Sequence, residues 1–148
     1  MSLAIVYTRA ALGIEAPLIT VEVHLSNGLP GLTMVGLPET TVKEARDRVR
    51  SALINSGYAF PAKKITINLA PADLPKEGGR YDLPIALALL VASEQLNTTR
   101  LNQYEFVGEL ALTGGLRGVP GAIPSAMEAI KAGPVSYTHL RAHETRSN

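Results

Sequence analysis

Alternating apolar and polar residues predict strands in the first half of the chain. Every second residue from Ile19 to Leu25 is apolar, so these side chains would share one face of a strand over residues 18–25. Apolar or alternating patterns predict three further strands, over residues 4–8, 32–35 and 63–69. Because Ser26-Asn27-Gly28 is a turn signal, we interpret residues 32–35 as the returning strand of a hairpin.

Apolar residues spaced by three and four predict two helices. The first covers residues 38–56, and its apolar face would comprise Val42, Ala45, Val49, Ala52 and Leu53. Gly57 is a natural residue to end it. The second helix is expected over residues 82–95, with Pro84 in its first turn, where no intrahelical hydrogen bond is lost.

The last third of the chain predicts a strand over residues 104–112, a loop or hairpin connection over 113–121 and a helix over 123–132. This order of elements indicates an α+β fold, a mixed β-sheet with helices packed on it, over residues 1–135. Residues 136–148 are polar and basic with no periodic apolar face, and we interpret them as a cloning-derived extension.

Composition narrows the classes of function. The 148 residues carry a formal net charge of +1, which gives no overall attraction to nucleic acid or membranes. The absence of cysteine excludes disulfides, thiol catalysis and cysteine-ligated zinc. The N-terminal residues do not resemble a signal peptide, and the longest apolar run, 83–92, is far below the ~20 residues of a membrane span. We therefore expect a cytoplasmic protein without a membrane partner.

A charged Gly-Gly loop precedes the second helix, and it contains four candidate binding residues, Lys76, Gly78, Gly79 and Arg80. One hypothesis is a binding site for a DNA phosphate, a carboxylate or a neighbouring subunit. The alternative, which we favour, is a tight turn whose glycines permit positive φ. In that case Glu77 and Asp82 would neutralise the two cations locally.

A second candidate is a basic stripe on the first helix, formed by Lys43, Arg46 and Arg50. It would contact DNA or a neighbouring subunit, although an ordinary solvated face is favoured because the net charge is near neutral. Three further cations could extend either patch, namely Arg9, Lys63 and Lys64. His24 is expected at the surface. The connection with Gly114, Gly115, Arg117 and Gly118 could form a partner-binding groove, but a structural turn is favoured.

Three long segments carry a resemblance to a known family: 28–53, 65–90 and 106–123, with the phrases VGLP, NLAPADLPKEG, YDLPIALA and GELALTG. They resemble the N-terminal domain of the magnesium chelatase-related YifB/ComM competence family. The resemblance implies a Lon protease-like (ribosomal protein S-five domain-2-like) fold. It also implies an AAA+ ATPase module beyond this chain, in a hexamer that acts on DNA, with ComM-type members promoting branch migration in natural transformation.

The catalytic residues of Lon proteases are not matched. Aligning their serine loop, K-[DE]-G-P-S-A-G, with residues 75–80 places Arg80 at the serine, and the lysine position falls on Ile123. Neither side chain can replace the serine nucleophile or its lysine base. Ser125 and Lys131 lie nearby in sequence, but on one short predicted helix.

The chain also lacks the phosphate-binding sequence G-x-x-x-x-G-K-[ST]. We therefore expect no enzyme activity, cofactor or metal site here, with ATP and Mg bound by the ATPase module. The leading interpretation is a non-catalytic accessory domain for subunit arrangement or DNA guidance. The alternatives are a partner-docking or oligomerisation domain without DNA contact, and a residual peptidase or hydrolase.

Overall fold

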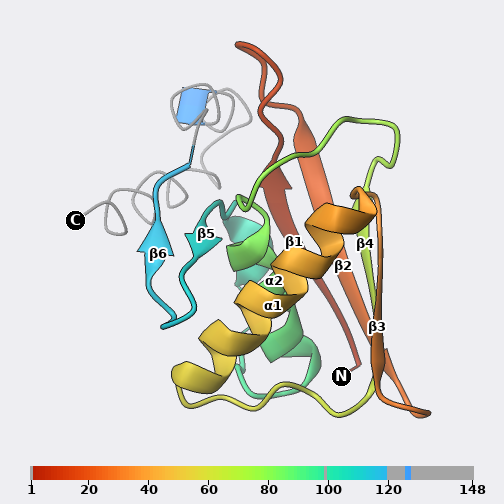
Figure 1. Ribbon diagram of the computed structural model, residues 1–148. Coiled ribbons are helices and arrows are strands. Elements are labelled where there is room, and N and C mark those ends of the chain that lie inside the picture. The colour runs from red at the N-terminus through yellow and green to blue at the C-terminus, as the bar shows by residue number, and fades with distance from the viewer. Residues whose placement is uncertain (1, 99, 120–125, 128–148) are drawn as a thin grey trace.

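A mixed sheet forms one layer of the computed structural model, which describes residues 2–98, 100–119 and 126–127 (Figure 1). Its strands are β1 (Leu3–Arg9), β2 (Leu18–Ser26), β3 (Gly31–Val35) and β4 (Lys64–Ala70). They lie in the order β1-β2-β4-β3, with β2 antiparallel to β1 and β4, and β3 parallel to β4. The four predicted strands are confirmed.

The predicted hairpin between β2 and β3 is wrong, because β4 lies between them. Ile65, Ile67 and Leu69 of β4 are at most 1% exposed, which is the pattern of a central strand. In β3 only Met34 is buried, as suits an edge strand. Residues 27–30 therefore span two strand spacings, about 10 Å, instead of making a tight turn.

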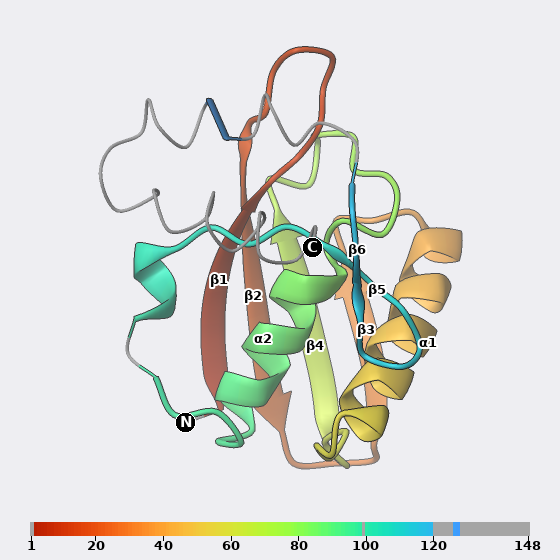
Figure 2. The ribbon, with the colours of Figure 1, turned by 90° about the vertical axis from the view of Figure 1, so that its left-hand side faces the viewer.

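Two helices pack on one face of the sheet (Figure 2). Along the chain, α1 (Glu39–Asn55) connects β3 to β4, and α2 (Asp82–Ala92) follows β4. The predicted apolar face of α1 is confirmed, because Ala45, Val49, Ala52 and Leu53 are buried and Val42 packs against the core. Helix α2 is buried almost all round, since it packs on β1 and β2 and lies beside α1. The structure is thus an α+β arrangement of two layers, as predicted.

Both helices end in the same hydrogen-bonded C-terminal motif. After α1, Gly57 adopts φ 89°, and the amide of Tyr58 donates to the carbonyl of Leu53 at 2.9 Å. Helix α2 ends at Ala92, three residues earlier than predicted. There Glu94 takes the left-handed position with φ 61°, so no glycine marked this end in the sequence.

The continuous strand predicted over residues 104–112 is wrong. After a short 3₁₀ helix (Leu101–Gln103), Glu105 makes an isolated parallel bridge to Tyr7. Regular pairing resumes only in β5 (Glu109–Leu110), which forms a hairpin with β6 (Leu116–Arg117). The loop or hairpin connection predicted over 113–121 agrees with this pairing up to residue 119.

Gly108 explains the break in that strand. Its amide donates to the carbonyl of Arg80, and its carbonyl accepts from the amide of Leu83, both at 3.0 Å. The chain therefore leaves β1 and crosses to the start of α2. These contacts place β5 beside the Gly-Gly loop.

The predicted helix over residues 123–132, with Ile123, Ser125 and Lys131, falls outside the described residues apart from 126–127. The same is true of residues 136–148. Within the described part of the chain, no helix combines the length and apolar character needed to cross a membrane.

Candidate functional site

Each glycine of the Gly-Gly loop has a local structural role, Gly78 through its positive φ and Gly79 through its close contact with Glu109. Gly78 adopts φ 76°, a conformation that favours glycine. Gly79 lies against Glu109, where an added Cβ would approach the Glu109 Cγ to 2.6 Å. Between the loop, Glu109 and residues 11–13 lies a cavity of about 530 Å³, which Glu77 and Arg80 also line.

Lys76 is directed into the loop and not toward solvent. It is 3% exposed, and its ammonium donates to the carbonyls of Pro71 and Leu74. Burial lowers the pKa of Lys76. These bonds use the ammonium to hold the loop in shape.

Arg80 is also buried, at 4% exposure, and its Nε donates to the backbone carbonyl of Arg9 at 3.0 Å. Burial lowers the pKa of Arg80. Arg9 itself pairs with Glu105 through two bonds of 2.6 and 3.0 Å. Because this pair is buried, Arg9 does not extend a surface basic patch.

The expectation that Asp82 neutralises the loop cations is wrong, because Asp82 pairs with Arg48 of α1. The Arg48 Nε lies 2.7 Å from Asp82 Oδ2, and a second bond of 3.2 Å joins NH2 to Oδ1. The amide of Leu110 also donates to Asp82 Oδ2 at 3.1 Å. This fully buried carboxylate therefore ties together α1, α2 and β5.

Burial raises the pKa of Asp82 to about 6, although its bonds to Arg48 and Leu110 lower it. Sequence reasoning missed Arg48. Its position offered one signal: it lies three residues after Ala45 and four before Ala52, beside the buried stripe of α1.

Only two of the three residues of the predicted basic stripe on α1 line the same groove. Arg46 and Arg50 line a groove of about 490 Å³ between α1 and residues 60–65, and Lys63 lines it from the other side. Lys43 is exposed on α1 outside this groove. The Arg50 guanidinium lies over the Phe60 ring, 5.7 Å from its centroid.

The β5–β6 hairpin packs against the C-terminal end of α1. Gly114 adopts φ 100°, and an added Cβ there would lie 2.3 Å from Ser56 Oγ and 3.3 Å from the carbonyl of Ala52. Asn55 bonds the carbonyl of Leu112 at 2.7 Å. These contacts support the interpretation of this connection as a structural turn, with Gly115, Arg117 and Gly118 exposed.

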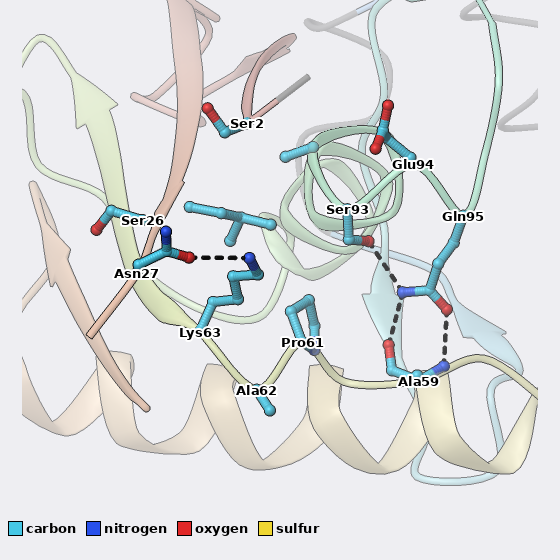
Figure 3. Close-up of a pocket in the computed structure, with 12 residues that line it drawn as sticks. Ser2, Ser26, Asn27, Ala59, Pro61, Ala62, Lys63, Ser93, Glu94 and Gln95 are labelled. Atoms are coloured by element: carbon cyan, nitrogen blue, oxygen red, sulfur yellow. Dashed lines mark hydrogen bonds between the residues drawn. The ribbon is translucent and has the colours of Figure 1, made fainter. Parts of the chain in front are cut away.

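A third cavity, of about 690 Å³, lies between the ends of β2 and α2 (Figure 3). Lys63 points toward Asn27 in this view and donates to its Oδ1 at 3.1 Å. Gln95 exchanges two hydrogen bonds with the backbone of Ala59, at 2.8 and 2.7 Å. The polar groups of this cavity thus largely satisfy one another.

At the Gly-Gly loop, backbone carbonyls accept hydrogen bonds from both Lys76 and Arg80. Lys76 bonds only backbone carbonyls among its described partners, and Arg80 occupies the position that the Lon alignment gives to the nucleophile. No cluster of three His, Asp or Glu residues in the described ranges could hold a metal ion.

The sequence matches the model of a protein family described as "Subunit ChlI of Mg-chelatase" over residues 21–137. The chain belongs to this magnesium chelatase-related family. It is 84% identical over 133 residues to an uncharacterised protein YifB of Salmonella typhimurium, and 68% identical over 132 residues to the competence protein ComM of Haemophilus influenzae. An uncharacterised Mycobacterium bovis protein, Mb2921c, is 38% identical over 133 residues.

These alignments cover 90%, 89% and 90% of the chain, and each covers 26% of the relative. The resemblance to the YifB/ComM group is therefore confirmed. The chain spans about a quarter of the length of the curated relatives that it matches.

Proposed function

We propose that the chain is a non-catalytic, Lon-like accessory domain of a magnesium chelatase-related AAA+ ATPase, which arranges subunits or guides DNA. The observation that carries this proposal is Arg80. The alignment with the Lon serine loop gives Arg80 the position of the nucleophile, and the guanidinium is buried and bonded to the Arg9 carbonyl. A group held in this way cannot attack a peptide bond.

The remainder of the proposal concerns the full-length protein. Its ATPase module would bind ATP and Mg, assemble as a hexamer and drive branch migration of DNA. Similarity to the competence protein ComM supports a DNA-directed role. Within this assembly, residues 1–135 would contact the ATPase module and neighbouring subunits, and single-stranded or branched DNA.

Deletion of residues 1–135 from the full-length protein tests the accessory role. We expect the deletion variant to show impaired hexamer assembly by light scattering or impaired branch migration of a synthetic junction. A deletion variant that assembles and migrates junctions like the intact protein would overturn the proposal. So would peptide cleavage by the intact protein that persists in Arg80→Ala.

A second candidate is a docking or oligomerisation domain without DNA contact. Two apolar side chains favour it, because Ile14 and Leu29 are each 89% exposed in loops at opposite ends of β2. In that case Ile14→Asp or Leu29→Asp would weaken subunit assembly of the full-length protein. Loss of assembly with unchanged DNA binding would favour this candidate.

A further inference from the structure

The groove between α1 and residues 60–65 has a local charge that the whole chain lacks. Its charged lining comprises three cations, Arg46, Arg50 and Lys63, against one carboxylate, Asp47. The cavity beside the Gly-Gly loop has the opposite balance, with Arg80 against Glu77 and Glu109. A polyanion would therefore be attracted to the groove on α1 and not to the Gly-Gly cavity.

One of the three cations is held in the groove before any ligand arrives. The Arg50 guanidinium lies over the Phe60 ring, whereas the Lys63 ammonium points into the neighbouring cavity, where it donates to Asn27 Oδ1 (Figure 3). Arg46 has a longer contact, 3.6 Å, with Asp47. Pre-ordered side chains lose less conformational entropy when a ligand binds, so binding is favoured.

The rest of the lining suits an unstacked base. Ile54, Phe60 and Pro61 supply apolar surface between the cations. Proteins that bind single strands combine a basic groove with aromatic or guanidinium planes on which bases stack. A duplex offers its phosphates to such a groove but keeps its bases stacked inside.

We propose that this groove binds single-stranded nucleic acid, with phosphates contacted by Arg46 and by Lys63, whose ammonium exchanges Asn27 for a phosphate, and with a base stacked on the Arg50 guanidinium. This inference rests on the proposed DNA-guiding function and assigns it to a specific surface. Lys63 and Phe60 join the site only through the fold, because they are 14 or more residues from Arg46 in sequence and line the other side of the groove.

The test is fluorescence anisotropy of a labelled 20-nucleotide oligo(dT), titrated with the 148-residue chain and with charge-reversal variants. We expect Arg50→Glu and Lys63→Glu each to weaken binding by about tenfold or more. Lys43→Glu is the matched control, because it makes the same charge change on the same helix outside the groove. It should weaken binding by less than about threefold, and residues 136–148 are common to all variants.

Two further measurements separate stacking from charge. Two phosphate contacts predict a slope of log affinity against log salt of roughly −1.4 for a single strand, and Arg46→Glu should make it shallower. Phe60→Leu keeps the charge but removes the ring under Arg50, so it should weaken binding severalfold without changing the slope. Thermal melting of each variant checks that its fold is retained.

Several results would overturn the inference: no binding at micromolar protein, equal affinity for a duplex of the same length, or equal losses in Lys43→Glu and Arg50→Glu. Any of these could occur while deletion of residues 1–135 still impairs assembly of the full-length protein. The groove would then be excluded as a nucleic-acid site, and the accessory role would stand on subunit contacts alone.

Discussion

Asp82 is a buried acid whose pKa is raised by burial and lowered by its pairing with Arg48. Its pKa of about 6 lies above the value near 3.9 expected in the unfolded chain. Between these pH values the folded protein binds a proton that the unfolded chain does not. The stabilisation linked to this proton is therefore complete below about pH 4 and is lost as pH rises through 6.

Asp82→Asn should remove this pH dependence. We expect the free energy of unfolding of the wild type, relative to Asp82→Asn, to fall by roughly 3 kcal/mol between pH 4 and pH 8, from two pKa units at about 1.4 kcal/mol each. Urea titrations across this range measure the difference. Asp47→Asn, which removes an exposed carboxylate on α1, is the matched control for the substitution itself. Parallel profiles for wild type and Asp82→Asn would contradict the prediction.

At the scale of elements, Gly36 determines how closely the chain after β3 approaches β4. It adopts φ 95°, and an added Cβ would lie 2.1 Å from the backbone carbonyl oxygen of Leu69. Gly57 also has positive φ, but an added Cβ there meets nothing within 4 Å. A side chain at Gly57 would therefore meet backbone strain alone, whereas one at Gly36 would meet both backbone strain and steric overlap.

Gly36→Ala should therefore destabilise the domain more than Gly57→Ala does. The Gly57 change costs about 1 to 2 kcal/mol of conformational strain. The Gly36 change adds an overlap with backbone that cannot rotate away, worth about 1 to 3 kcal/mol more. Equal unfolding midpoints for the two variants in urea would show that β3 and β4 can move apart without cost.

The buried face of α1 gives a third prediction. Val49 is 1% exposed and belongs to the core, so Val49→Asp would place an unpaired charge there. We expect a loss of more than about 3 kcal/mol in the free energy of unfolding, or insoluble protein. Lys43→Asp, on the exposed side of the same helix, should melt within a few degrees of the wild type. A soluble Val49→Asp variant with unchanged melting would contradict the assignment of this face.

Local patterns in the sequence were enough to predict the helices and strands of the first ninety residues, because side-chain periodicity follows directly from which face is buried. They could not predict which strands are neighbours. The insertion of β4 between β2 and β3 depends on Ile65 and Ile67 requiring burial, which is a comparison between distant segments. The Arg48–Asp82 pair was missed for the same reason, since its partners are 34 residues apart.

The candidate site also contains residues that the sequence indicated and residues that only the fold brings together. The sequence indicated Arg46 and Arg50 as one basic stripe, but it could not place Lys63 and Phe60 opposite them. It also gave no indication that Lys76 and Arg80 are buried. Charge is visible in a sequence, whereas the direction of a long side chain depends on the packing around it.

At the scale of the whole molecule, a continuous core joins the sheet to both helices. Buried side chains from all four main strands, from α1, from α2 and from Leu110 of β5 form one cluster. A single cluster of this kind predicts a single cooperative unit, although the relatives are about four times longer. The domain should therefore fold without the rest of the full-length protein.

Urea unfolding of the 148-residue chain, followed by far-ultraviolet circular dichroism and by tyrosine fluorescence, tests this prediction. Tyr81 is 1% exposed beside α2, and Tyr58 lies after α1, so fluorescence reports on packing near both helices. Both probes should give one coincident transition, because loss of either helix exposes the shared core. Separate midpoints would mean that α1 with β3 and β4 can open while α2 stays on β1 and β2. In that event the β5–β6 hairpin, which touches α1 through Asn55 and α2 through Asp82, would be too weak to couple the two parts.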